Sequence, residues 1–525
     1  MAEPNDEKIG SLDISRGRRD AIKAGVGAAV AAMMNSSPAS AAEGPMFKAG
    51  DISQAGWKNE ANRISGNGPM DGPTRQLVEY VASVNESILT PSVRAAAGHC
   101  MLDGMSALIA GFESEPGRIS ARLARTIQSD LKSTVLGYGV VTSPELAAFA
   151  NGCMLRHCDF NDLGPSGHTS DIISGILAVA EAFHVTGDQM LMGVALGYEL
   201  VGALGRAGAG EGWDGLWEGP STALVMGKLM GLDKDRLANA FSLSLVPHFP
   251  SNVTHIGHLS HWKGCHPAEA IKCATWATLL AKEGMTGPPQ PFEARNGVFD
   301  HNGPFRRPLQ LPYPGPNGKT FVERMGFKRY PAVGGTQPEL ELMPQIRAWT
   351  NWQDIESIYV EEPFGAWQES ADPPKWDPRN RETADHSQPF VIARALIDGD
   401  IYLDTFTKEK IMDPVARSLM AKITIAPNPE MTAPAEGGTV GLARITIRRT
   451  KEPREKVFMT QVGSSYQTPM THEELIAKFN RVCAFRSIPD SQRDQAREQL
   501  LNLGSIKDMA IPMRTLAKFG KPQPL

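Results

Sequence analysis

Hydrophobic residues recur at helical spacing over a long segment of the chain, from about Pro73 to Thr286. Between Asp171 and Phe183 the Ile, Leu, Ala and Phe side chains fall on one stripe, as they do in an amphipathic helix. Gly187 is expected to stop that helix, and a second apolar helix is predicted from about Gln189 to Leu204. The pattern therefore predicts consecutive helices that pack together.

Cap residues mark further helix ends in this segment. Asp233 is typical of a residue that caps a helix N-terminus, here a helix that runs through Leu245. Pro267 fits the first turn of a helix that ends near Glu283, with Gly284 just past its end. Because Ala and Gly are abundant on these helices and permit close approach, we expect a helical bundle.

The pattern changes after the Pro- and Gly-rich stretch from Pro312 to Gly318. Short runs rich in β-branched residues then predict strands. These runs are Ile355–Val360, Ile423–Ile425, Arg444–Arg448 and Val457–Val462. Helices are predicted between them at about Pro389–Ile397 and Pro414–Ala421, and helical spacing returns from Thr471. The expected fold class is mainly α, a large all-helical domain with a smaller α+β domain inserted before the C-terminal helices.

The N-terminus resembles a twin-arginine export signal. Arg18 and Arg19 precede a mildly apolar run from Ala24 to Met34, and Ala39-Ser40-Ala41 supplies small residues for cleavage. We therefore expect a periplasmic or secreted protein. Acidic residues ahead of the arginine pair leave an alternative open, namely a cytoplasmic protein with a disordered tail and a chance Arg-Arg.

These changes in pattern divide the chain into five segments. They are the signal at 1–41, a linker at 42–72, the helical domain at 73–325, the α+β domain at 326–467 and the C-terminal helices at 468–525. The last segment is expected to return to the helical domain.

The composition narrows the class of protein. A chain of 525 residues suits two or three domains, and its 41% hydrophobic and 21% charged content is ordinary for a globular protein. The net charge of −5 argues against a nucleic-acid partner, and no apolar stretch is judged long enough for a membrane span. The six cysteines form no C-x-x-C pair, so we expect free, buried thiols rather than a zinc or redox site.

The first cluster of candidate chemical residues lies on a glycine-broken loop. Asp159, Asn161, Asp162 and His168 lie there, just ahead of the helix expected at Asp171. Carboxylates and a histidine near a helix N-terminus suit general acid–base catalysis. An ordinary surface loop is the alternative, and metal ligation would need a third convergent ligand that the sequence does not specify.

Two further clusters carry lysines. Lys263 lies just ahead of the helix expected at Pro267, where the helix dipole disfavours an ammonium group and attracts carboxylates. Lys328 and Arg329 lie where the two predicted domains meet, with Gln337 nearby, and fit a carboxylate pocket. A solvated lysine and a salt bridge between domains are the respective alternatives.

The fourth cluster runs from Arg381 to Ser387 and contains Asp385 and His386. It precedes the helix predicted at Pro389. A catalytic role is one interpretation, but a capping and hydrogen-bonding network is the preferred one.

These clusters, in this order, resemble the MmgE/PrpD family from about Leu102 to Phe479. The segments that carry the resemblance are Asp159-Phe160-Asn161-Asp162, His168-Thr169-Ser170-Asp171, Gly197-Tyr198-Glu199, Trp262-Lys263-Gly264, Gly284-Met285-Thr286-Gly287-Pro288 and Arg381 through Ser387. Each segment is short, but the ordered set is specific.

The family includes 2-methylcitrate dehydratase, cis-aconitate decarboxylase and iminodisuccinate epimerase. The resemblance implies a homodimer whose active site lies, without metal or other cofactor, between a helical domain and an α+β lid. By motif position the family's pocket residues fall at Asp159, His168, Lys263 and Lys328, which we predict to be catalytic. The residues predicted to bind substrate are Asn161, Asp162, Arg329 and Gln337.

Some positions depart from the family pattern. His255 stands where an arginine is frequent, Leu163 where a threonine is frequent, and Thr169 where many members have proline. Gln337 stands where the decarboxylases have histidine, which favours the dehydratase-like branch. These departures bear on the substrate more than on the reaction class.

The leading hypothesis is a metal-independent lyase that eliminates water from a small hydroxy-polycarboxylate such as 2-methylcitrate. The lysines would neutralise substrate carboxylates and the developing negative charge, and His168, held by Asp159 or Asp162, would transfer the proton. The alternatives are decarboxylation or epimerisation of a related polycarboxylate, and a polycarboxylate-binding protein without catalysis.

Overall fold

The computed structural model describes residues 69–164, 167–208, 216–248, 251–431, 442–460, 469–520 and 522–525. The predicted signal at 1–41 and the linker as far as residue 68 lie outside the described residues. All six cysteines lie within them as free thiols, and each except Cys273 is buried, as predicted.

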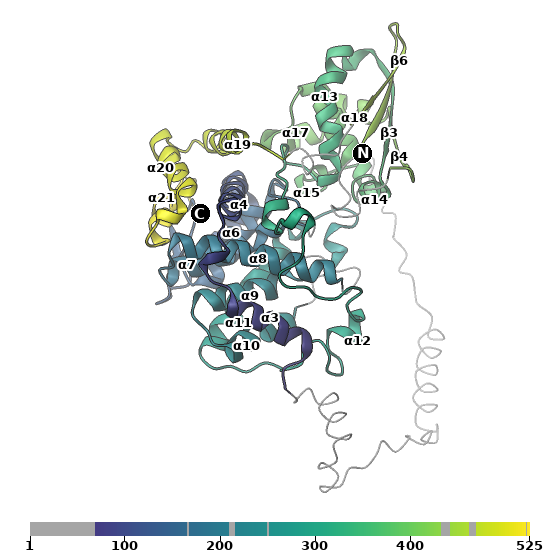
Figure 1. Cartoon of the computed structure of the whole chain (residues 1–525). Helices are drawn as coiled ribbons and strands as arrows, with labels where there is room; N and C mark the ends of the chain where they lie inside the picture. The colour runs from purple at the N-terminus through teal and green to yellow at the C-terminus, as the bar shows by residue number, and fades with distance from the viewer. Residues whose placement is uncertain are drawn as a thin grey trace, which may run out of the picture. The chain divides into compact units, whose positions relative to one another are not determined.

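Helices account for most of the described chain up to Asn302 (Figure 1). They are α3 (Gly72–Ser83), α4 (Pro91–Gly111), α5 (Glu115–Ala124), α6 (Pro144–His157), α7 (Ile173–Ala182), α8 (Gly187–Ala207), α9 (Glu218–Leu229), α10 (Lys234–Leu245), α11 (Trp262–Lys282) and α12 (Val298–Asn302). Asp233 caps α10 as predicted, because its side chain accepts a hydrogen bond from the Arg236 N–H.

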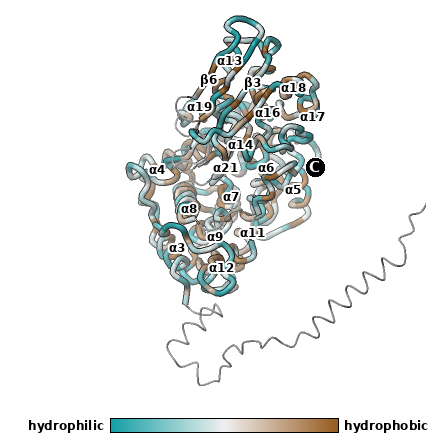
Figure 2. Tube along the Cα trace, turned by 90° about the vertical axis from the view of Figure 1, so that its right-hand side faces the viewer, coloured by the Kyte–Doolittle hydropathy of each residue, from teal (hydrophilic) through white to brown (hydrophobic). Residues whose placement is uncertain are grey.

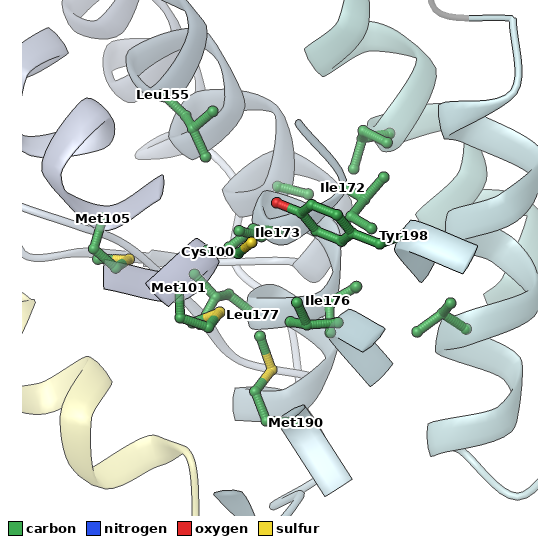
Figure 3. Close-up of a cluster of buried hydrophobic side chains, with 14 of the residues drawn as sticks. Cys100, Met101, Met105, Leu155, Ile172, Ile173, Ile176, Leu177, Met190 and Tyr198 are labelled. Atoms are coloured by element: carbon green, nitrogen blue, oxygen red, sulfur yellow. The ribbon is translucent and has the colours of Figure 1, made fainter. Parts of the chain in front are cut away.

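Helices α4, α7 and α8 contribute most of the labelled side chains in the close-up of Figure 3, where buried Ile, Leu and Met residues meet. In α7 every residue from Ile173 to Ala180 is buried, and the hydropathy along this helix can be followed in Figure 2. The stripe predicted between Asp171 and Phe183 is therefore only part of the buried surface. The reason is that α6, α8, α9 and α11 all contact α7.

A two-stranded hairpin, which the sequence pattern does not predict, interrupts the helices. β1 (Ser133–Val135) pairs antiparallel with β2 (Val140–Thr142). Glu181 of α7 accepts hydrogen bonds from the backbone N–H and the hydroxyl group of Thr134, which ties the hairpin to the bundle. Strands this short offer too few positions for alternation to be recognised in the sequence.

Gly187 begins α8 instead of stopping the preceding helix, so that expectation was wrong. Thr186 and Gln189 form a capping box, in which each side chain accepts a hydrogen bond from the other residue's backbone N–H. A Cβ atom at Gly187 would collide with the carbonyl oxygen of Leu503. Glycine is thus needed here for close approach of the C-terminal segment.

Helix α8 also corrects the expectation about apolar stretches. Within the described residues it is the one helix long and apolar enough to cross a membrane by length and composition. However, 89% of its apolar window is buried inside the protein, as in a core helix.

The predicted strands form a four-stranded sheet in the order β4-β3-β5-β6. They are β3 (Ile355–Glu362), β4 (Ile423–Pro427), β5 (Arg444–Arg449) and β6 (Glu455–Met459), the last lying slightly earlier than predicted. β3 runs parallel to β4 and antiparallel to β5, and β5 runs antiparallel to β6. Ile358 pairs with both Ile423 and Ile447, so the three buried isoleucines line up across the sheet.

Further helices accompany the sheet: α13 (Gln337–Trp349), α14 (Phe364–Ser370), α15 (Arg381–Ala384), α16 (Gln388–Asp398), α17 (Lys408–Ile411) and α18 (Pro414–Met420). Side chains from α13, α16, α18 and the strands form a hydrophobic cluster separate from that of the first helices. α16 and α18 match the predicted helices. α13 was not predicted, and Pro338 and Pro344 within it obscure its helical pattern.

The chain ends with α19 (His472–Phe485), α20 (Asp490–Leu501) and α21 (Ala510–Leu516), which pack against the first helices. α19 and α20 contact α4, and α21 contacts α7, an arrangement visible in Figure 1, where these helices are yellow. Leu475 and Phe479 belong to the same hydrophobic cluster as α4. The fold is therefore mainly α with a small α+β part ahead of the C-terminal helices, as predicted. The segment boundaries stay predictions.

Candidate active site

Helix α11 begins at Trp262, which places Lys263 in its first turn. Pro267 lies inside the helix and not in its first turn, so that prediction was wrong. A proline has no N–H to donate to the carbonyl group four residues earlier, here that of Lys263. Nδ1 of His266 lies 3.2 Å from this carbonyl oxygen and donates to it instead. The helix therefore continues through the proline.

Gly264 allows the first turn of α11 to approach α6 closely. A Cβ atom at this position would lie 3.2 Å from the Cα of His157. The neighbouring Lys263 side chain is fully buried, with 0% of its surface exposed. The alternative of a solvated lysine at this position was therefore wrong.

Two carboxylates face the buried Lys263. Its Nζ atom donates to Oδ1 of Asp385 at 3.1 Å and lies 3.8 Å from Oδ1 of Asp159. Asp385 directly follows α15. The ion pair therefore connects the first helices to the α+β part. Oδ2 of Asp385 is buried and has no hydrogen-bond partner among the described residues.

Asp159 lies at the centre of a larger group of charges. Nζ of Lys328 lies 2.6 Å from its Oδ2 and 3.0 Å from its carbonyl oxygen, and Arg156 pairs with its Oδ1. Leu163 and Gly326 exchange backbone hydrogen bonds of 3.0 and 3.1 Å, which holds the Asp159 loop beside the segment of Lys328.

The buried charged residues in mutual contact are named the charge cluster. They are Arg156, Asp159, Lys263, Lys328 and Asp385.

The charge cluster changes the acidity of its members. Burial by itself raises the pKa of Asp159, but the positive charges of Lys328, Lys263 and Arg156 outweigh it and hold that pKa well below its usual range. Burial lowers the pKa of Lys328 to about 8, although the Asp159 carboxylate opposes this change. At neutral pH Asp159 is therefore ionised, while Lys328 loses its proton only slightly above neutrality. Perturbed groups of this kind gather at functional sites.

His168 lies at the edge of the charge cluster with an orientation suited to proton transfer. Its Nδ1 lies 2.6 Å from the backbone carbonyl oxygen of Asp162, which can only accept, so Nδ1 carries the proton. Nε2 is then the basic nitrogen, and it lies 3.9 Å from Oδ1 of Asp159. Burial, together with the charges of Arg156 and Lys328, holds the pKa of His168 well below its usual range. The ring, 18% of whose side chain is exposed, is therefore neutral, and its Nε2 can accept a proton from a ligand, although the lowered pKa makes it a weaker base than a free imidazole.

The Asp162 carboxylate holds the loop in place. Its Oδ1 accepts hydrogen bonds from the backbone N–H and the hydroxyl of Ser170, and its Oδ2 accepts one of 2.7 Å from the Tyr198 hydroxyl. Burial raises the pKa of Asp162 to about 6, although these hydrogen bonds oppose the rise. Its predicted role in substrate binding stays a prediction.

The three other predicted binding residues also have structural partners. The Asn161 amide donates to the Ser170 hydroxyl and the Asp171 carboxylate, both at 3.0 Å. Arg329 donates to the Glu474 carboxylate at 3.2 Å. The Gln337 amide donates to the backbone carbonyls of Tyr330 and Ala332 at 3.0 and 3.1 Å. Their roles in binding substrate stay predictions.

The sequence analysis did not select several residues that complete the site. Asp385 lies in the cluster for which a capping and hydrogen-bonding network was preferred. Ser387 of that cluster does cap α16, whereas Asp385 faces Lys263. Arg156, three residues before Asp159, is another of these unselected residues. Lys478 of α19 lies in no motif or cluster that the sequence analysis selected. Its Nζ nevertheless donates to Oδ1 of Asp103 at 2.6 Å and to the carbonyl oxygens of Phe160 and Lys328 at 2.7 and 2.9 Å.

Potential metal ligands lie next to the charge cluster. His255, Glu369 and His386 present nitrogen and oxygen atoms that all lie within 4.8 Å of one another. Nδ1 of His386 also lies 2.8 Å from Oδ1 of Asp385. This group therefore adjoins the charge cluster through one shared carboxylate.

Sequence models of both MmgE/PrpD domains match the chain. The MmgE/PrpD N-terminal domain matches residues 75–304, and the MmgE/PrpD C-terminal domain matches residues 330–503. The chain is 27% identical to the 2-methylcitrate dehydratase of Salmonella typhimurium, over 83% of this chain and 95% of that protein. It is 24% identical to the cis-aconitate decarboxylase of Homo sapiens, over 86% and 95% of the two chains. It is 22% identical to the cis-aconitate decarboxylase-like protein oryM of Aspergillus oryzae, over 85% and 98%.

Proposed function

The chain belongs to the MmgE/PrpD family, and we propose that it is a lyase that eliminates water from a small hydroxy-polycarboxylate resembling 2-methylcitrate. The observation that carries this proposal is the convergence of Lys263, Lys328 and His168 around Asp159. The similarity to a 2-methylcitrate dehydratase along nearly all of that protein supports the same reaction.

The cations of the charge cluster suit a substrate with several carboxylates. Lys263 and Lys328 are buried beside aspartate carboxylates, but with Arg156 the cluster holds three cationic groups against two carboxylates, so its formal charge is positive and suits an anion. Removal of a proton next to a substrate carboxylate places negative charge on that carboxylate in the transition state. A positioned ammonium group stabilises this charge more strongly in a buried site than in water.

The proton transfers follow from the states of the side chains. Nε2 of neutral His168 accepts the proton from the substrate carbon. The electrons of that C–H bond form the new double bond, and the C–O bond breaks. Lys328, with its pKa of about 8, supplies the proton that lets the hydroxyl group leave as water. Carbon is neither oxidised nor reduced overall, so the charge cluster and His168 suffice without a redox cofactor.

Decarboxylation of a related polycarboxylate is the second candidate. It is favoured by the similarity to the human and Aspergillus oryzae proteins named for cis-aconitate decarboxylation. The same lysines would stabilise the carbanion left when carbon dioxide departs. The remaining alternatives are epimerisation of a related polycarboxylate and binding of a polycarboxylate without catalysis.

A substrate assay in deuterated water separates these candidates. The full-length protein is incubated with 2-methylcitrate, with cis-aconitate and with chiral succinate derivatives, and products are followed by NMR. A dehydratase gives an unsaturated acid with an unchanged number of carbons, and a decarboxylase gives a product with one carbon fewer. An epimerase incorporates deuterium with inversion, and a binding protein shows thermal stabilisation with no exchange. The Lys263→Met variant is the control, and equal turnover in this variant and the wild type would contradict the proposed site.

Assembly and location are part of the proposal. We propose a homodimer, which light scattering of the purified protein tests through its molar mass. We also propose export by the twin-arginine route. Mass spectrometry of the mature N-terminus would find cleavage near Ala41 if export occurs, and an intact leader would favour a cytoplasmic protein.

A further inference from the structure

A cluster of nitrogen and oxygen ligands adjoins the charge cluster on the side of Asp385. The atoms belong to His255 at the end of η4 (Asn252–His255), Glu369 of α14 and His386 after α15. We propose that these three side chains bind a divalent transition-metal ion. This inference goes beyond the proposed elimination, whose steps use the charge cluster and His168.

The geometry of the three side chains fits a small ion. Each ligand atom lies within 4.8 Å of the other two, and the His255 and His386 rings are 5.8 Å apart between centroids. A tetrahedral ion with bonds of about 2.1 Å separates its ligand atoms by about 3.4 Å, so closure requires a shift on the order of 1 Å. His255 and Glu369 are only partly buried, so an ion has a path to enter.

The surroundings of His386 favour metal binding. Its Nδ1 lies 2.8 Å from Oδ1 of Asp385, so Nδ1 donates to the carboxylate and Nε2 is left as the ligand atom. A carboxylate that holds the far side of a metal-binding imidazole fixes its orientation and increases its basicity. The same Asp385 oxygen accepts from Lys263. The metal site and the charge cluster therefore share one carboxylate.

The ligand types determine the class of ion. Two imidazoles and one carboxylate suit Zn²⁺, Co²⁺ or Fe²⁺. Mg²⁺ and Ca²⁺ prefer shells made of oxygen atoms and gain little from imidazole. Three protein ligands leave at least one position of a tetrahedral ion open, and water or an oxygen atom of a small molecule would occupy it.

Cobalt titration of the full-length protein without an affinity tag tests the site directly. After removal of metals by a chelator, Co²⁺ is added and its visible absorption is recorded, and Zn²⁺ is then added as a competitor. We expect one Co²⁺ per chain, displaced by Zn²⁺ and not by millimolar Mg²⁺. His255→Ala and Glu369→Gln should each weaken Co²⁺ binding by about 100-fold. His258→Ala is the matched control, because it removes an exposed imidazole close by in the chain and should leave binding unchanged.

Thermal melting provides a second readout that does not depend on catalysis. Saturating Zn²⁺ should raise the melting temperature of the wild type and His258→Ala, but not of the two ligand variants. Absence of a saturable Co²⁺ spectrum, or equal Co²⁺ affinity in the wild type, His255→Ala and Glu369→Gln, would overturn the proposal. Displacement by Mg²⁺ would overturn the assigned class of ion. Since no substrate is present, failure here leaves the proposed elimination untouched, and failure of the substrate assay leaves this site untouched.

Discussion

The ammonium nitrogen of Lys263 lies 3.1 Å from Oδ1 of Asp385, a residue 122 positions further along the chain. Both side chains are fully buried. Water cannot replace either partner, so removal of one leaves an uncompensated charge in the interior. A substitution of either residue of this pair therefore changes the candidate site and lowers the stability of the fold at the same time.

Replacement of Asp385 by asparagine should destabilise the protein. Lys263 would keep only Asp159, at 3.8 Å, as a facing carboxylate. We expect a loss of about 3–5 kcal/mol in the free energy of unfolding, measured by urea denaturation. The double variant Lys263→Met with Asp385→Asn should recover most of this loss, because it removes both buried charges. Additive losses in the double variant would contradict the ion-pair interpretation.

Replacement of His168 by alanine should affect turnover far more than stability. The ring makes one short hydrogen bond, to the Asp162 carbonyl, and is partly exposed, so the fold depends little on it. Loss of a general base lowers kcat by about 10²–10⁴-fold, and KM should change little. Steady-state kinetics and a melting curve check both parts. A kcat close to that of the wild type would exclude His168 as the base.

The pH dependence of kcat/KM should report Lys328. Its pKa is about 8, and the proposed role needs the protonated form, which is present below this pH and lost above it. The wild-type kcat/KM should therefore fall as the pH rises through about 8. In Lys328→Arg kcat/KM should be much lower and should not fall up to a pH of about 10, because arginine keeps its charge but does not release its proton to the leaving group. A profile that is the same in both proteins would assign the titration to another group.

Asp162 should make stability depend on pH in the acidic range. Its pKa is about 6 in the folded protein against an ordinary value of 3.8, so the folded state binds the extra proton between these values. This contribution to stability is present at low pH and is lost as the pH rises from about 4 through 6. Relative to Asp162→Asn, the wild type should lose about 2 kcal/mol of unfolding free energy between pH 4 and 7. Parallel pH profiles for the two proteins would contradict the raised pKa.

Much of the fold could be predicted because single elements leave periodic patterns. The strands of the larger sheet and the cap of α10 can be predicted from the residues within and directly beside each element. Pro267 shows the limit of such rules. Proline usually marks a first turn, but here the His266 side chain compensates for the missing N–H, and the helix begins earlier.

The candidate site could be predicted only in part. Asp159, His168, Lys263 and Lys328 stood out because each lies in a conspicuous local cluster, and the structure brings them together. Asp385 was not selected, since its partner Lys263 is distant in the chain. The spacing of residues along the sequence does not show which distant side chains meet in the folded protein.

Lys478 has a consequence for when the site forms during synthesis. This lysine, on α19, donates hydrogen bonds to the carbonyl oxygens of Lys328 and of Phe160, which directly follows Asp159. Chains are folded from the N-terminus as they leave the ribosome. A nascent chain therefore cannot possess the finished arrangement until α19 has emerged, and copies cut ahead of α19 are expected to be inert.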